Sequence, residues 1–321
     1  MPRPTAATTL QRPDLGMLAY EYNATASQRG FIGTLAMPAF FVPEQTADYP
    51  VIPIEALLKL PDTKRAPRAN YNRGDYEFET DTYACIENGW EEPLDDVERR
   101  LYARLFDAEM VAVQRAIDII LRVQEKRISA LLFNTGNFSS TGVATEWSTI
   151  TSTPYADVIA GKQSMRANGG LEPNSLIMSK KVLENLLKVT EVRTSLQYSA
   201  DKQIEFMGKD AQAQMLARYF GVDRILVGDA IYDSAKKKQS FSISDIWDDE
   251  YVMLAKVSNA PDILDPSVGR TFVWEEDAPG MLVTEQYREE QKRSWIYRTR
   301  QHTDEEIIFA NAGYLLSNIT A

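Results

Sequence analysis

The chain has 321 residues, of which 44% are apolar and 25% charged, as in a globular protein with a substantial core. Its net charge of −11 argues against a protein that functions by gripping nucleic-acid phosphates, and it has no apolar run of the ~20 residues needed to cross a bilayer. A single cysteine, Cys85, and a single histidine, His302, exclude an intrachain disulfide and a multi-histidine metal site.

The N-terminal part of the chain is expected to be extended. Residues 1–34 carry few large apolar groups until Phe31 and are predicted to form an arm. Residues 43–93 contain six prolines, which disfavour a continuous helix, whereas residues 76–80 alternate as a strand. We therefore predict a two-stranded loop that projects from the body. Because an isolated hairpin is marginal in water, such a loop needs another surface to lie on.

A long helix is predicted next. Residues 94–133 contain no Gly or Pro, and Asp95 and Asp96 stand where carboxylates cap a helix start. Apolar residues recur at helical spacing at Val97, Leu101, Leu105, Ala108, Ala112, Ala116, Ile119 and Val123. A helix of roughly thirty residues reaches about 45 Å at ~1.5 Å per residue, so we predict a spine rather than an ordinary globular helix.

The rest of the chain divides into two parts with different predicted secondary structure. Helices are predicted at 154–168, 179–187 and 210–220, and strands at 175–178, 222–228 and 251–255, which together make a compact α/β unit. From residue 269 onward the pattern favours strands, at 271–274, 281–284, 295–298 and 307–309. Their connections are too short for parallel crossovers, which predicts an antiparallel sheet.

The sequence contains no clear catalytic, phosphate-binding or metal-binding motif. Gly161-Lys162 is followed by Gln163, so the phosphate-loop pattern fails. His302 precedes residues 303–306, a predicted turn, and is interpreted as a surface residue, while Cys85 is interpreted as a small half-buried apolar residue. Acidic runs at 91–92, 95–96, 248–250 and 275–277 are typical of solvated turns, although a paired-acid or cation site stays open. We predict no catalytic, cofactor-binding or metal-binding residues and no enzyme.

The projecting loop carries a basic stretch with Lys64, Arg65, Arg68, Tyr71 and Arg73. This stretch could be a nucleic-acid patch. In a net-acidic chain a protein contact is favoured, with arginines pairing with carboxylates of a neighbour.

The order of these parts, and several short sequences within them, resemble the major capsid proteins of tailed bacteriophages, in a phage and prophage subfamily with the Hong Kong 97-type shell fold. The matching stretches are residues 65–73, 83–85, 89–93, 124–128, 130–132, 145–147, 170–174, 221–228, 246–247 and 269–272. They span about residues 65–275, and their order is more specific than any one of them.

The resemblance implies an α+β fold with five parts. These are an N-terminal arm (1–34), an extended loop or E-loop with its anchor (35–93), a peripheral domain with the spine helix (94–149), a compact α/β axial domain (150–265) and the returning sheet of the peripheral domain (266–321). Many relatives carry a helical scaffolding segment ahead of the arm. Here a short arm precedes the loop, so scaffolding is expected to be a separate protein or absent.

The resemblance also implies a function. Such subunits assemble through pentamers and hexamers into an icosahedral shell that encloses double-stranded DNA without sequence-specific binding. The expected location is the virion, after assembly in the host cytoplasm, with scaffolding, portal and decoration proteins as partners. Contacts between copies are expected at Arg65, Arg68, Tyr71, Arg73, Trp90, Glu91 and Glu92. An encapsulin-like compartment shell is one alternative, and an acidic cytosolic enzyme with a lid at 43–92 is a weaker one.

Overall fold

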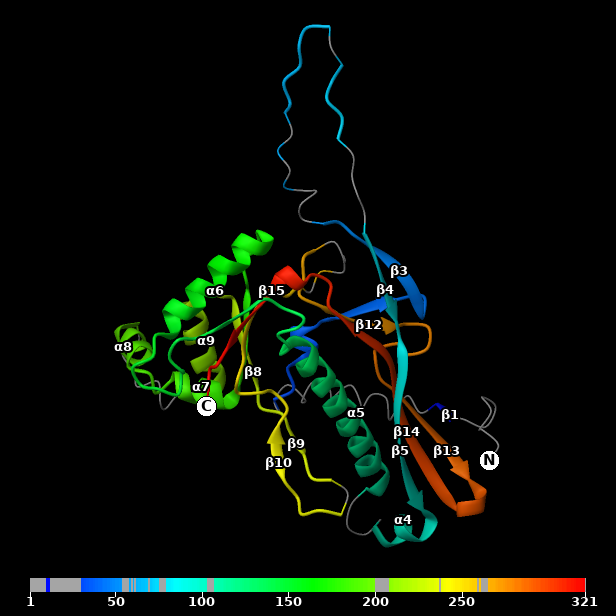
Figure 1. The fold of residues 1–321 in the computed structure, drawn as a ribbon. Coiled ribbons are helices and arrows are strands. Elements are labelled where there is room, and N and C mark those ends of the chain that lie inside the picture. The colour runs from blue at the N-terminus through cyan, green and yellow to red at the C-terminus, as the bar shows by residue number, and fades with distance from the viewer. Residues whose placement is uncertain are drawn as a thin grey trace.

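The computed structural model describes residues 10–11, 30–53, 58, 60, 62–68, 70–74, 79–102, 107–199, 208–236, 238–258, 260 and 265–320. One half of the molecule is organised around the long strand β14 (Ser294–Glu306) (Figure 1). One edge of β14 pairs antiparallel with β5 (Ile86–Asp95). Its other edge pairs antiparallel with β13 (Val283–Glu289) and then with β12 (Arg270–Trp274). The antiparallel sheet predicted after residue 269 is therefore confirmed, although the strand predicted at 307–309 does not form.

Segments from before the loop extend this sheet. Strand β2 (Ala39–Val42) pairs parallel with β12, and β1 (Leu10–Gln11) pairs antiparallel with β13. The turn predicted at 303–306 is wrong, because these residues continue β14 and pair with β12. Apart from residues 10–11 and 30–34, the predicted arm lies outside the described residues.

The predicted spine is divided. Residues 94–95 end β5, α4 (Asp96–Tyr102) follows, and α5 (Ala108–Leu132) begins at a separate N-cap, Asp107. The Asp107 carboxylate accepts hydrogen bonds from two amides of the first turn of α5, at 3.0 and 3.3 Å. An aspartate is tolerated inside a helical pattern but also caps a new helix, so the lack of Gly and Pro did not reveal the boundary.

The predicted apolar stripe is confirmed at Ala108 and Ala116, which are buried, and is wrong at its two ends. Val97, Leu101 and Val123 belong to the predicted stripe, but they are 59%, 65% and 49% exposed. The other apolar residues on the buried face of α5 are Val113, Ile117, Ile120, Leu121, Ile128 and Leu132. Because α4 and α5 are separate helices, one helical phase cannot run through both. No helix in the described part of the chain is long and apolar enough to cross a membrane.

The other half is an α/β unit around a five-stranded sheet. The strand order is β6 (Ser140–Gly142), β15 (Gly313–Ser317), β11 (Val252–Ala255), β7 (Ser175–Ser179), β8 (Arg224–Gly228). The helices of this unit are α6 (Pro154–Gly169), α7 (Lys180–Leu186), α8 (Thr190–Ser199) and α9 (Lys209–Phe220) (Figure 1). The predicted helices and strands are confirmed here, and α8 was missed. The helix stops follow from Gly170 and Gly221, which both adopt φ of 62° as left-handed C-caps.

Two features of this unit were not foreseen. The expectation that 266–321 forms the returning sheet is wrong at its end, because β15 pairs with β11 and not with β14. A hairpin of β9 (Ile231–Asp233) and β10 (Ile243–Asp245) extends from the unit beside α5 (Figure 1). Lys126 of α5 lies over the ring of Tyr232 in this hairpin, at 3.8 Å from the ring centroid.

The projecting loop leaves the body as a two-stranded ribbon. Strand β3 (Thr46–Val51) pairs antiparallel with β4 (Glu79–Ala84), and the chain between them extends far from both halves (Figure 1). Residues 76–78 of the predicted strand at 76–80 lie outside the described part. The loop ends earlier than the expected residue 93, because residues 86–95 belong to the sheet of the body as β5.

Candidate assembly surface and the root of the projecting loop

The basic residues predicted to contact neighbours lie at the far part of the loop, away from the rest of the chain (Figure 1). Arg65 lies over the ring of Tyr71, 4.6 Å from its centroid, and Tyr71 is 72% exposed. Arg68 and Arg73 are exposed and have no ion-pair partner among the described residues. At Arg68 and Arg73 the loop therefore presents cationic side chains that form no ion pair with any residue the structure describes.

The other predicted contact residues lie elsewhere, on β5. Glu91 pairs with Arg298 of β14, with 2.7 Å between the carboxylate oxygen and the guanidinium nitrogen. Glu92 accepts a hydrogen bond from the Trp90 indole at 3.0 Å. Trp90 is 46% exposed. The structure thus separates the predicted contact residues into an exposed loop tip and a group on the β5 strand of the body sheet.

The root of the loop rests on an aromatic cluster. The Tyr83 ring stacks on Phe272 of β12, with centroids 4.6 Å apart and an interplanar angle of 11°. The Tyr49 ring packs against the same Phe272 at 5.5 Å. One polar bond reinforces this contact, because the Asp304 carboxylate accepts from the Ala84 amide at 2.7 Å. The ribbon is therefore attached to the body through β12 and the end of β14.

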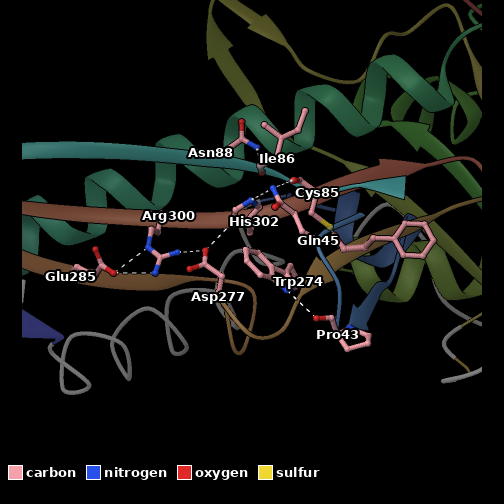
Figure 2. Close-up of polar contacts among 11 residues, drawn as sticks. Pro43, Gln45, Cys85, Ile86, Asn88, Trp274, Asp277, Glu285, Arg300 and His302 are labelled. Atoms are coloured by element: carbon pink, nitrogen blue, oxygen red, sulfur yellow. Dashed lines mark hydrogen bonds and ion pairs between the residues drawn. The ribbon is translucent and has the colours of Figure 1, made fainter. Parts of the chain in front are cut away.

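His302 lies beside this root, within a polar network (Figure 2). It is 7% exposed, so its interpretation as a surface residue is wrong. The ring nitrogen Nδ1 lies 2.8 Å from an Asp277 carboxylate oxygen. Asp277 also pairs with Arg300, and Arg300 donates to Glu285 at 3.1 Å. The His302 ring packs edge-on against the Trp274 ring, with the two ring centroids 5.0 Å apart.

Cys85 lies close to His302, although the two are far apart in sequence. The Gln45 side-chain nitrogen donates to the Cys85 carbonyl at 3.2 Å and lies 3.4 Å from His302 Nε2 (Figure 2). The Cys85 thiol, in contrast, points to the Phe272 carbonyl at 3.7 Å. Burial raises the thiol pKa to about 11, so the sulfur is protonated at neutral pH. The pair is therefore arranged as a structural contact and not as a nucleophile with its base.

Three carboxylates, Asp81, Asp304 and Glu306, lie near one another where the loop root meets the body, a contact that we call the seam. Burial, with the nearby charges of Asp304 and Asp81, raises the pKa of Glu306 to about 7. Burial also raises the pKa of Asp304. Within the described residues, no group of three or more His, Cys, Asp or Glu side chains could hold a metal ion. At this seam, protonation of the carboxylates is expected to alter the local charge.

Comparisons with known proteins agree with this geometry. No family model matches the chain. The major capsid protein of Burkholderia phage BcepMu is 27% identical over 299 residues, covering 90% of this chain and 91% of that protein. A phage-related protein from Bordetella bronchiseptica RB50 has a similar structure, with a TM-score of 0.72, 21% identity, and coverage of 97% and 98% of the two chains. A virus-like particle from Pyrococcus furiosus gives a TM-score of 0.58 at 13% identity, covering 95% of this chain and 98% of that one.

Other structural neighbours include phage and prophage capsid proteins. The chain therefore has the α+β, Hong Kong 97-type fold that was expected from its sequence. The resemblance to tailed-phage major capsid proteins is likewise confirmed.

Proposed function

We propose that this protein is the major capsid protein of a tailed bacteriophage or prophage, a structural protein whose copies assemble into a closed shell. The observation that carries this proposal is the similarity to the BcepMu major capsid protein along nine-tenths of both chains. The finer proposal is that pentamers and hexamers form an icosahedral shell around double-stranded DNA. A division into arm, E-loop, peripheral domain, axial domain and returning sheet is proposed with it, with residues 86–95 placed in the peripheral sheet and 313–317 in the α/β sheet.

The exposed loop supports assembly from many copies. A closed shell needs large obligate interfaces, of the order of 2,000 Å² or more. A long loop supplies contact area without a core of its own, provided that another copy lies beneath it. We propose that Arg65, Arg68, Tyr71 and Arg73 of one copy contact carboxylates of the next. Trp90, Glu91 and Glu92 are proposed as contacts on β5, where Glu91 and Glu92 would keep their partners within the chain.

The remaining partners follow from the same role. Scaffolding, portal and decoration proteins are proposed as separate chains, and the virion as the final location after assembly in the host cytoplasm. The net charge of −11 is consistent with a lining that confines DNA without strong adhesion. A compartment shell that packages protein cargo is the second candidate, because the neighbour from Pyrococcus furiosus is described as a virus-like particle.

One experiment separates these functions. The purified protein, expressed alone and with candidate scaffolding proteins, is examined by negative-stain electron microscopy, and nuclease-protected nucleic acid in the particles is measured. Closed shells formed by the expressed protein support the capsid function, if particles taken from phage lysates also contain DNA. Shells that contain protein cargo and no DNA support the compartment. A monomer that forms no curved assembly at any concentration contradicts both.

A further inference from the structure

The β9–β10 hairpin turns an apolar face to the solvent. Tyr232 of β9 lies against Lys126 of α5, so this side of the hairpin faces the helix. Side chains alternate along a strand and paired residues share a face, which places Ile231 and Ile243 on the opposite side. These two side chains are 44% and 58% exposed. The face directed away from α5 is therefore apolar and open to solvent.

This apolar face extends to the turn of the hairpin. The Ser234 amide donates to the Ser242 carbonyl at 2.8 Å, so the two segments stay paired beyond the ends of β9 and β10. Phe241, two residues before Ile243, lies on the same face and is 72% exposed. A two-stranded ribbon has no core of its own, and exposed apolar patches mark contacts with other proteins. The hairpin therefore has the character of an interaction surface.

The turn of the hairpin is basic. Lys236 and Lys238 are exposed and form no ion pair with any residue that the structure describes. The Asp233 carboxylate of the same hairpin is engaged elsewhere, because it accepts hydrogen bonds from the amides of Ala235 and Ser242, at 3.0 and 3.1 Å. An apolar face that ends in two free lysines fits a protein surface with exposed apolar side chains beside carboxylates.

Strand β5 of the same chain offers such a surface. Ile86 and Trp90 share one face of this strand and are 64% and 46% exposed. Residues 86–95 include no lysine or arginine and four carboxylates, which belong to Glu87, Glu91, Glu92 and Asp95. Glu87 is exposed and forms no ion pair within the part of the chain that the structure describes. The strand is thus the acidic and apolar counterpart of the hairpin.

The hairpin and β5 lie on opposite sides of α5 (Figure 1). Lys126 of α5 contacts the hairpin, whereas Arg115 of the same helix lies 3.6 Å from the Glu92 carboxylate of β5. Two copies that stand side by side in the same orientation would therefore bring the hairpin of one copy toward β5 of the next. Such a head-to-tail contact joins two different surfaces and can repeat until a ring closes.

We propose that the β9–β10 hairpin of one copy docks on β5 of a second copy, with its apolar face against Ile86 and Trp90 and its lysines near Glu87. A second copy fits better than nucleic acid, because phosphates give the apolar face no partner. That copies of this chain associate at all rests on the proposed function. The choice of these two surfaces rests on their complementary charge and on their places beside α5.

Thiol cross-linking of the full-length chain tests the contact. Ser240→Cys places a thiol next to Phe241 in one tagged version of the chain. Asn88→Cys places a thiol between Ile86 and Trp90 in a second version with a different tag. The two versions are mixed before assembly and treated with a short bismaleimide. We expect the cross-link between the two tags to form at least fivefold more often than for the control pair.

The control pair combines Ser240→Cys with Glu184→Cys, at an exposed position of α7. The chain without an added cysteine serves as the blank, because its Cys85 is buried. Equal yields for the two pairs, a dominant cross-link between two hairpins, or no cross-link at any protein concentration overturns the proposed contact. Electron microscopy of the same samples reports on shells separately. A cross-link without shells contradicts the proposed function alone, and shells without the cross-link contradict this contact alone.

A second measurement does not depend on added thiols. Phe241→Ser combined with Ile243→Ser should weaken self-association, measured by sedimentation velocity, tenfold or more, because two large apolar side chains no longer leave water. Circular dichroism of the subunit should not change, since both side chains are exposed. Ile150→Ser, at a position that is 60% exposed and away from the hairpin and β5, should change association less than twofold. Association unchanged in the double variant overturns the contact.

Discussion

The Trp247 indole nitrogen donates a hydrogen bond of 2.7 Å to the carboxylate of Glu125, although the two residues are 122 positions apart. The same carboxylate accepts from the backbone amides of Ile32 and Gly33, at 2.8 and 2.7 Å. Glu125 is 3% exposed, and burial raises its pKa while the three donors oppose that shift. One side chain thus joins α5 to the α/β unit and to the segment that precedes the loop.

Replacement of Glu125 should destabilise the whole subunit. Glu125→Ala leaves three buried donors without their acceptor, and each unsatisfied group costs about 1–3 kcal/mol. We expect the free energy of unfolding, measured by urea denaturation of unassembled subunits, to fall by about 3 kcal/mol or more. Glu184→Ala, at an exposed position of α7, is the matched control and should change it by less than about 0.5 kcal/mol. Equal losses in the two variants would show that the three hydrogen bonds contribute nothing.

A second prediction concerns the ion pair between α5 and β14. Arg127 donates to both carboxylate oxygens of Glu305, at 2.8 and 2.9 Å, and the Glu305 side chain is 6% exposed. Arg127→Met leaves this buried carboxylate without its cation, which should cost about 2 kcal/mol of unfolding free energy. Arg122→Met removes a half-exposed pair with Asp118 on the same helix and should cost about 0.5 kcal/mol or less. Thermal denaturation of both variants measures the difference, and a cost no larger for Arg127→Met would contradict the prediction.

The third prediction is that ionisation of Glu306 makes the free energy of unfolding depend on pH. The pKa of Glu306 is raised from 4.5 to about 7 in the folded protein. A carboxyl group with a raised folded-state pKa stabilises the fold fully below its ordinary pKa, and this contribution is lost as the pH rises through about 7. Glu306→Gln should therefore be more stable than the natural protein at pH 8, by about 1 kcal/mol after allowance for solvent screening.

At pH 4.5 the two proteins should differ little, because Glu306 is then protonated. Urea denaturation at both values measures this, with Glu276→Gln in an exposed turn as the control. A constant difference between Glu306→Gln and the natural protein at both pH values would refute the assigned cause.

The fourth prediction tests the loop tip. Arg68→Glu combined with Arg73→Glu should lower the yield of shells at least several-fold, because like charges then meet across the proposed interface. Circular dichroism of the subunit should not change, since both side chains are exposed and without an ion-pair partner in the described chain. The pair Arg68→Lys and Arg73→Lys keeps the charge and should retain most of the yield. Normal particle numbers from the charge-reversed protein would exclude this contact.

The sequence alone predicted most elements of the α/β unit. Pro154 at the start of α6, and Gly170 and Gly221 at helix ends, are local devices that act through backbone geometry. It also predicted a projecting loop with a basic tip, because the prolines and the charge pattern are visible without any partner. Each of these features is determined by residues that lie close together in the sequence.

The tertiary structure decided what depends on distant partners. Strand β15 pairs within the α/β sheet and residues 86–95 pair with β14, because pairing between distant strands outweighed the local sequence pattern. The same applies to His302 and Cys85. The sequence showed one histidine and one cysteine, far apart, and only the folding of β14 against the loop root brought both to the side-chain nitrogen of Gln45.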